Sequence, residues 1–276
     1  MKTSLKPLLL KNKILVFPGC FNAFTAKLIE KNGFDGVYLS GAALANSLGV
    51  SDTGIIGLKE FKEAGVQITR SVNLPVIADA DTGFDDIEKT VKAYIKAGLS
   101  GLHIEDQVFP KRCGHLSGKE VISQAEMIKK IKTAVSIKNK IKPDFLIIAR
   151  TDARGAKNIE EKLQFEEALR RGAACLKAGA DVIFPEALKS KEEFINFRKA
   201  IPGFLMVNMT EFGKSPLLTT KELEKMGYNL IIFPVTLFRY SAAFIEKALK
   251  VLKEFRSSSL TFWLFLTSSA QNSLSP

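Results

Sequence analysis

A short run of the chain gathers catalytic side-chain types around one cysteine. Cys113 follows Lys111 and Arg112, and it precedes Gly114 and His115. Neighbouring positive charges stabilise a thiolate, and glycine allows the backbone to turn sharply. The run therefore predicts a poised acid/base thiol in a loop. A stray cysteine among solvated charges is the alternative, but the density of neighbours favours a catalytic loop.

Two carboxylates, Asp79 and Asp81, lie two residues apart. Side chains at this spacing in an extended chain point the same way, so the pair is suited to a hard divalent cation. A site with few carboxylates favours Mg²⁺, with Mn²⁺ as a substitute, because such an ion keeps several waters. Asp52 and Glu105 are expected in the outer shell. The structural alternative is that Asp81 begins a helix and Asp79 forms a salt bridge.

Four cations are expected to surround that metal: Arg150, Arg239, Lys111 and Arg112. Fixed positive charge suits a substrate with several carboxylates. A metal and an arginine beside a thiol acid/base predict carbon–carbon bond cleavage or formation through an enolate-like intermediate. The chain has no P-loop and no Gly-x-Gly-x-x-Gly between a strand and a helix, so the sequence offers no support for a nucleotide cofactor.

Eight short apolar runs alternate with helical patterns along the chain. This alternation predicts parallel strands covered by helices, and eight repeats fit a single-domain α/β fold, a closed (β/α)8 barrel of the TIM type. Apolar residues at helical spacing predict helices over Ile87–Ala97, Met127–Val135 and Glu222–Met226. The expected strands are Ile14–Phe17, Gly36–Leu39, Pro75–Asp79, Gly101–Glu105, Phe145–Arg150, Val182–Pro185, Phe204–Asn208 and Leu230–Phe233.

Polar residues follow seven of these strands at the carboxyl end, where barrel enzymes build their active sites. One such residue at a loop tip is ordinary, but agreement between seven strands predicts one shared site. The residues are Ser40 and Gly41, Asp79 and Asp81, Glu105, Arg150, Glu186, Asn208 with Thr210, and Arg239.

Three other residues have structural interpretations. His103 lies inside the fourth strand and is expected to be a hydrogen-bonded core histidine rather than a metal ligand. Cys20 is expected to pack after the first strand, and Cys175 to lie inert in a helix.

Composition narrows the class of protein. The 276 residues are 46% hydrophobic and 25% charged, as in an ordinary globular protein. The net charge is +11, but lysines spread over helical faces supply most of the cations, so we expect no nucleic-acid partner and a small polyanionic substrate. No apolar run reaches the roughly 18 residues of a membrane span, and Met1–Lys13 has no apolar leader. A cytoplasmic protein with reduced cysteines is therefore expected.

Together these motifs resemble the isocitrate lyase and phosphoenolpyruvate mutase superfamily, and within it the 2-methylisocitrate lyases. The similarity runs from about Val16 to about Leu252. The Lys-Arg-Cys-Gly-His run resembles the lyases and is absent from the related phosphonate mutases and hydrolases. The landmarks are Pro18-Gly19, Asn22-Ala23, Tyr38–Ala42, Asp79–Phe84, Glu105–Gln107, Lys111–His115, Ala149–Ala153, Phe184–Glu186 and Asn208–Gly213.

The resemblance implies a magnesium-dependent lyase that cleaves the tricarboxylate 2-methylisocitrate to succinate and pyruvate, in the methylcitrate cycle of propionate catabolism. It implies that Asp79 and Asp81 hold the metal, that Asp52 and Glu105 assist through water, and that Cys113 protonates the succinate carbanion. The loop at 108–119 would close over the site, and the enzyme would be a homotetramer. The implied substrate-binding residues are Ser40, Gly41, Ala42, Gly114, Arg150, Glu186, Asn208, Thr210 and Arg239.

Two segments depart from this family. Between Arg154 and Gly179 the chain is several residues longer than expected, and we expect Glu160–Arg171 to extend a surface helix. Residues 257–276 carry no charge and group several aromatic and aliphatic residues at 262–266. We therefore expect a barrel domain over 1–256 and an atypical tail over 257–276. Such a tail replaces the family's C-terminal helices and their arginine, as a truncated or frame-altered end would, and it is expected to weaken the tetramer.

Three alternative functions remain open. Isocitrate is the second candidate substrate, since one methyl group changes binding by only about 1–3 kcal/mol. A decarboxylase or hydrolase of a small keto acid would use the same metal site. A degenerate barrel that binds magnesium and dicarboxylates without turnover is the non-enzyme alternative.

Overall fold

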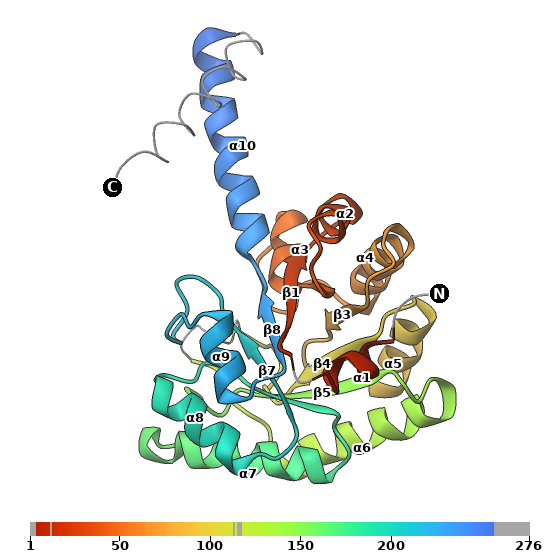
Figure 1. The fold of residues 1–276 in the computed structure, drawn as a ribbon, viewed down its shortest axis with the longest axis vertical. Helices are drawn as coiled ribbons and strands as arrows, with labels where there is room; N and C mark the ends of the chain where they lie inside the picture. Colours follow the sequence, from red (N-terminus) through yellow and green to blue (C-terminus); the bar gives the residue numbers. More distant parts are fainter. Residues whose placement is uncertain (1–3, 12, 113, 115–117, 257–276) are drawn as a thin grey trace. The chain divides into compact units, whose positions relative to one another are not determined.

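The computed structural model describes residues 4–11, 13–112, 114 and 118–256, and its centre is a closed barrel of eight parallel strands (Figure 1). Each strand pairs with its sequence neighbours, and β1 closes the barrel on β8 with Leu15 opposite Leu230. The predicted (β/α)8 fold is confirmed. The strands are β1 (Leu15–Cys20), β2 (Val37–Leu39), β3 (Val76–Asp79), β4 (Gly101–Glu105), β5 (Leu146–Thr151), β6 (Val182–Pro185), β7 (Phe204–Asn208) and β8 (Leu230–Phe233).

The barrel interior is filled by apolar side chains from the strands. Phe17, Ile77, Ile148 and Phe184 belong to this core, each fully buried. The short helix α1 (Leu5–Leu9), which is not predicted from the sequence, adds Leu5 and Leu9 to the same cluster. Large apolar side chains inside the barrel leave no channel, so chemistry is confined to the strand ends.

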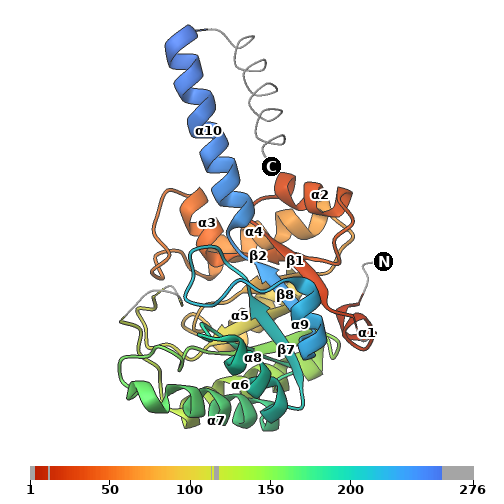
Figure 2. The ribbon, with the colours of Figure 1, turned by 60° about the vertical axis from the view of Figure 1, so that its left-hand side comes forward.

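Helices connect successive strands and cover the outside of the barrel. Figure 2 shows α6, α7 and α8 as part of this outer layer. Several helices begin at side-chain caps, such as Asp86 before α5 and Ser123 before α6, which accept hydrogen bonds from first-turn amides. The helices are α2 (Ala23–Lys31), α3 (Gly41–Ser47), α4 (Leu58–Ser71), α5 (Ile87–Lys96), α6 (Gln124–Ile141), α7 (Gln164–Lys177), α8 (Lys191–Ala200) and α9 (Thr220–Met226), with a 3-10 turn at Glu161–Leu163.

The chain divides into two compact units, Met1–Thr236 and Leu237–Pro276. The described part of the second unit consists of Arg256 and of helix α10 (Thr236–Phe255) from Leu237 on, and residues 257–276 lie outside the described residues. Among the residues with a described structure, no helix is both long and apolar enough to cross a membrane.

Candidate active site

Six strands deliver buried polar side chains to the carboxyl end of the barrel. The residues are Ser40 after β2, Asp79 at the end of β3, Glu105 at the end of β4, Arg150 near the end of β5, Glu186 after β6 and Asn208 at the end of β7. Thr210, two residues further on, is also buried. Because parallel strands end at one rim, these side chains occupy one region, as the sequence predicts.

The acidic pair lies on this rim, but its geometry differs from the prediction. β3 ends at Asp79, and Asp81 has a φ of 45° rather than an extended conformation. Asp81 lies in a turn that a hydrogen bond from the Gly83 amide to the Ala80 carbonyl (2.7 Å) closes, and the Asp81 amide donates to Asp79 Oδ1 (2.9 Å). Burial and the charge of Asp79 raise the pKa of Asp81 to about 7. The Asp81 carboxyl is therefore more readily protonated than an ordinary aspartate.

His103 supports Asp79 from within the barrel. Its ring is fully buried, with Nε2 at 2.8 Å from the Tyr38 hydroxyl and 3.5 Å from Asp79 Oδ1. Burial lowers the pKa of His103 and so favours a neutral ring. The prediction of a hydrogen-bonded core histidine is confirmed.

Lys111 and Arg112 lie in different environments. The Lys111 ammonium is buried, contacts Asp52 and lies 2.6 Å from Asp81 Oδ1. Burial alone would lower the pKa of Lys111, but Asp81 and Asp52 outweigh it and raise that pKa well above its usual range. Lys111 is thus the cation next to the acidic pair, as the sequence predicts. Arg112 is exposed, which differs from the expectation that it surrounds the metal.

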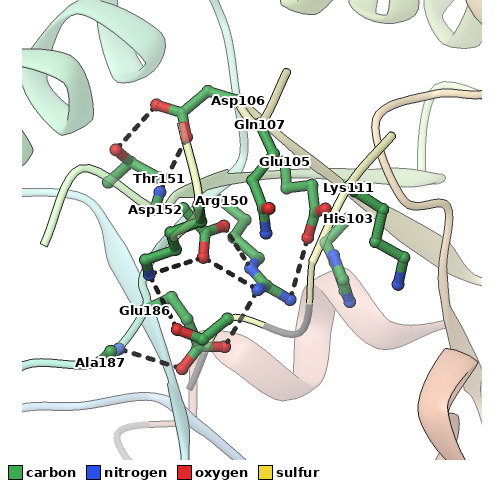
Figure 3. A network of polar contacts seen from close by, with 12 residues as sticks. His103, Glu105, Asp106, Gln107, Lys111, Arg150, Thr151, Asp152, Glu186 and Ala187 are labelled. Carbon is green, nitrogen blue, oxygen red and sulfur yellow. Dashed lines mark hydrogen bonds and ion pairs between the residues drawn. The ribbon is translucent and has the colours of Figure 1, made fainter. Parts of the chain in front are cut away.

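Arg150 connects the carboxylates of three strands (Figure 3). Its Nη1 lies 3.2 Å from Glu105 Oε2, its Nη2 3.6 Å from Glu186 Oε2, and its Nε donates to Asp152 Oδ2 at 2.8 Å. The guanidinium carbon also lies 5.4 Å from the centre of the Phe184 ring. The carboxylates fix the orientation of a guanidinium that can receive an anionic substrate.

Residues behind Arg150 complete the network, and sequence reasoning missed them. Asp152 binds Arg150 through both oxygens, and its Oδ1 also accepts from the buried Lys119 ammonium (2.9 Å). Asp106 accepts from the Asp152 amide (2.7 Å) and forms an ion pair with Arg171 of α7 (2.9 Å). The only sequence signal was the presence of Asp106 and Asp152 within motifs of the resemblance.

Two glycines of the predicted site lie where a side chain would not fit. A Cβ on Gly41 would lie 2.6 Å from Asp79 Oδ2, and a Cβ on Gly114 would lie 2.2 Å from Arg150 Nη2 and 2.6 Å from Glu186 Cγ. All three distances are shorter than any ordinary contact. The backbone at these glycines therefore approaches the charged side chains directly.

The remaining predicted residues have varied positions. The Ser40 hydroxyl accepts from the Ala43 amide (3.2 Å) and so caps α3, whereas Ala42 is half-buried. The side-chain nitrogen Nδ2 of Asn208 donates to Glu186 Oε2 (3.3 Å). Arg239 belongs to α10 in the second unit and is described with that unit.

Cys113 and His115 lie outside the described residues. Their predicted roles in catalysis therefore stay predictions. The same limit applies to part of the loop at 108–119 that is expected to close over the site.

A cavity of about 450 Å³ opens beside the acidic pair. Asp81 and Thr82 form one side, and Phe84, Ile56 and Phe109 supply apolar surface. This volume is in the range of small-molecule sites. Asp81 is therefore the member of the acidic pair that borders this cavity.

The donor set fits a hard divalent cation with few protein ligands. Within the described residues, no three His, Cys, Asp or Glu side chains converge on a single metal position. Asp79 and Asp81 nevertheless offer adjacent buried carboxylates, and Glu105 Oε1 is buried without a hydrogen-bond partner. Mg²⁺ is commonly bound through one or two carboxylates and retained waters. These residues fit magnesium better than a metal that needs histidine or cysteine.

The fold and the site define a (β/α)8-barrel protein with a charged, buried centre at the carboxyl ends of its strands. The family model described as phosphoenolpyruvate phosphomutase matches residues 5–253. The chain belongs to this family, and the predicted superfamily is confirmed.

Known relatives agree with this placement. The chain is 46% identical over 253 residues to a 2-methylisocitrate lyase of Aeropyrum pernix, an alignment that covers 91% of this chain and 79% of the relative. A crystal structure of 2,3-dimethylmalate lyase matches with a TM-score of 0.85 and 34% identity, covering 91% and 84% of the two chains. A phosphonopyruvate hydrolase in complex with oxalate and Mg²⁺ matches with a TM-score of 0.80 and 29% identity, covering 91% and 86%.

Proposed function

We propose that this chain is a carbon–carbon lyase that cleaves 2-methylisocitrate to succinate and pyruvate. The observation that carries the proposal is the buried rim, where Arg150 lies among carboxylates near the acidic pair Asp79 and Asp81. The 46% identity to a 2-methylisocitrate lyase favours this substrate. A fixed cation and a metal ion both suit the binding of a tricarboxylate. At the rim, Arg150 offers the cation, and Asp79 and Asp81 offer carboxylates for the metal.

Asp79 and Asp81 would hold Mg²⁺, with Asp52 and Glu105 assisting through water. The phosphonopyruvate hydrolase complex with Mg²⁺ supports this choice of metal in a related barrel. When bound, the ion would stabilise negative charge that develops on substrate oxygens. His103, whose Nε2 pairs with the Tyr38 hydroxyl, lies beside the Asp79 carboxylate and helps to orient it.

The side chains of this chain have separate tasks in the cleavage. Arg150 binds a substrate carboxylate, and Asp152 and Glu105 hold its guanidinium in position. As the carbon–carbon bond breaks, the substrate hydroxyl gives its proton to a neighbouring carboxylate of the rim and becomes the keto oxygen of pyruvate. The bonding electron pair passes to the succinate fragment, and the Cys113 thiol supplies the proton that this carbanion accepts. Lys111, Arg112 and His115 would favour the thiolate that remains.

Product analysis tests the function. We would measure pyruvate release from 2-methylisocitrate with Mg²⁺ beside glyoxylate release from isocitrate. Pyruvate release is the expected result, and glyoxylate alone would move the substrate to isocitrate. No product from a folded protein would contradict the lyase proposal and favour a keto-acid hydrolase or decarboxylase, or a barrel that only binds. Cys113→Ser should abolish cleavage, and unchanged turnover in this variant would exclude the proposed acid.

Oligomeric state and location belong to the same proposal. We propose a cytoplasmic enzyme with a barrel domain over 1–256, in which the uncharged segment 257–276 weakens the family-like tetramer. Size-exclusion chromatography is expected to show a monomer or an aggregate. A well-behaved tetramer would contradict the proposed effect of the segment.

A further inference from the structure

The loop that follows β4 is closed at its base by backbone hydrogen bonds. Gln107 and Val121 form an antiparallel bridge. The Val108 amide donates to the Glu120 carbonyl (2.9 Å), and the Ile122 amide donates to the Asp106 carbonyl (2.8 Å). These bonds fix both ends of the loop, which contains the predicted catalytic run.

The Gln107 side chain reaches from this base into the loop. Its Nε2 donates to the Arg112 carbonyl (2.8 Å), and its Oε1 accepts from the Arg112 amide (2.9 Å). Gln107 itself is buried, and the two bonds that it makes to the exposed Arg112 are partly buried. One amide side chain therefore satisfies both backbone polar groups of Arg112.

Lys119 holds the loop from the other side. Its side chain is 0% exposed, and its ammonium donates to the Gly114 carbonyl and to Asp152 Oδ1, both at 2.9 Å. The Lys119 carbonyl accepts from the Lys157 amide (2.8 Å), which fixes its backbone to the segment after β5. A buried lysine is costly unless it is paired and hydrogen-bonded, and here both conditions are met.

Asp152 joins Lys119 to the substrate-binding arginine. Its Oδ1 accepts from Lys119 Nζ and also from Arg150 Nη2 (3.1 Å). Burial alone would raise the pKa of Asp152, but Arg150 and Lys119 outweigh it and hold that pKa below its usual range. The carboxylate therefore stays charged, and a continuous set of contacts connects Gly114 to Arg150.

We propose that Gln107 and Lys119 are positioning residues for the catalytic loop. They hold the peptide groups of Arg112 and Gly114, which precede and follow Cys113 in the sequence, and Lys119 fixes this loop to Arg150 through Asp152. The inference rests on the proposed function only in that Cys113 and Arg150 act on the same substrate. Neither Gln107 nor Lys119 needs to touch that substrate.

Limited trypsin digestion under native conditions tests the anchoring without any need for activity. Lys119→Met and Gln107→Leu should each accelerate cleavage after Arg112 roughly tenfold or more, because the loop opens more often when a buried bond to a charged or amide group is lost. The matched control is Lys138→Met. Lys138 is also buried and binds both Asp181 oxygens. Asp181 accepts a hydrogen bond from the amide of Ile147, near the start of β5 and away from the loop.

Kinetics separate positioning from stability. In Lys119→Met, kcat should fall roughly a hundredfold with little change in KM, as for a displaced catalytic group. Lys138→Met should lower the melting temperature by a similar amount and keep its kcat. Cleavage after Arg112 that is no faster in Lys119→Met than in Lys138→Met would overturn the proposal, as would an unchanged kcat. If the wild type does not cleave 2-methylisocitrate, the proposed function fails. The rate of trypsin cleavage after Arg112 then tests by itself whether Gln107 and Lys119 anchor the loop.

Discussion

At the scale of single residues, Gly114 is the position where one added methyl group should affect activity most. A Cβ there would lie 2.2 Å from Arg150 Nη2 and 2.9 Å from Asp152 Oδ1. Gly114→Ala must therefore displace the loop or the guanidinium. We expect kcat/KM for 2-methylisocitrate to fall by about a hundredfold or more. Steady-state kinetics together with a thermal melt measure both effects.

Gly65→Ala is the matched control for this substitution. Gly65 lies within α4, and a Cβ there would meet its nearest atoms at 3.6 Å, an ordinary contact. Alanine also favours a helix over glycine, so stability should be kept or raised. Equal kcat/KM values for Gly114→Ala and the wild type would contradict the close approach of Gly114 to Arg150.

Residue types predicted the site better than they predicted its geometry. Asp79, Glu105 and Arg150 were identified because they lie at or next to strand ends, a property that the apolar pattern reveals. The burial of Lys119 is invisible in sequence, since lysine is usually exposed and its partner Asp152 is 33 residues away. The turn at Asp81 was also missed, because a non-glycine residue with positive φ is uncommon.

At the scale of elements, the strands were predictable and the smallest helix was not. β4, β6, β7 and β8 match the sequence prediction at both ends. β1 extends to Cys20 because its Gly19 and Cys20 pair with β2, although Pro18 and Gly19 interrupt the apolar pattern. Helix α1 has only five residues, too few for a helical period to be recognised.

Helix α7 contributes an ion pair on which the strand ends depend. Arg171 is 2.9 Å from Asp106, and both side chains are buried. Arg171→Met would leave the Asp106 carboxylate without its cation, which costs about 3–5 kcal/mol of unfolding free energy. Urea denaturation measures this loss. Arg170→Met, which removes an exposed partner of Glu167, should change stability little, and equal losses in the two variants would contradict the argument.

Helix α9 provides a pH-dependent contribution to stability. The Glu222 carboxylate binds the Lys191 ammonium (2.8 Å) and the Thr219 amide (2.9 Å), which lower its pKa to about 2. A depressed pKa stabilises the fold above the ordinary glutamate value, and this gain disappears as the pH falls towards 2. Melting temperatures of the wild type and Glu222→Gln should therefore differ at pH 7 and converge on acidification. A difference that is constant between pH 7 and pH 3 would contradict this origin.

At the scale of the whole molecule, most of the buried charged side chains lie together at the carboxyl-terminal rim of the barrel, whereas apolar side chains fill its interior. Among the described residues, the rim buries the carboxylates of Asp79, Asp81, Glu105, Asp152 and Glu186 and the cations of Lys111, Lys119 and Arg150. Five negative charges against three positive ones leave this region short of two positive charges. Such an excess is stable only if protons or a cation compensate it, and the raised pKa of Asp81 reflects the same shortage. A divalent cation at the acidic pair would supply the missing charge.

Magnesium should therefore stabilise the native protein as well as support its reaction. An ion that binds only the folded state adds about 2.7 kcal/mol at a hundred times its Kd, which corresponds to a rise of several degrees in melting temperature. Asp81→Asn should lose this rise, because it removes one of the two adjacent carboxylates. Asp144→Asn, at an exposed residue that contacts Ser4, should keep it. Thermal melts with and without Mg²⁺, supported by calorimetric titration, decide the point: an equal rise in both variants would place the ion elsewhere than at the acidic pair.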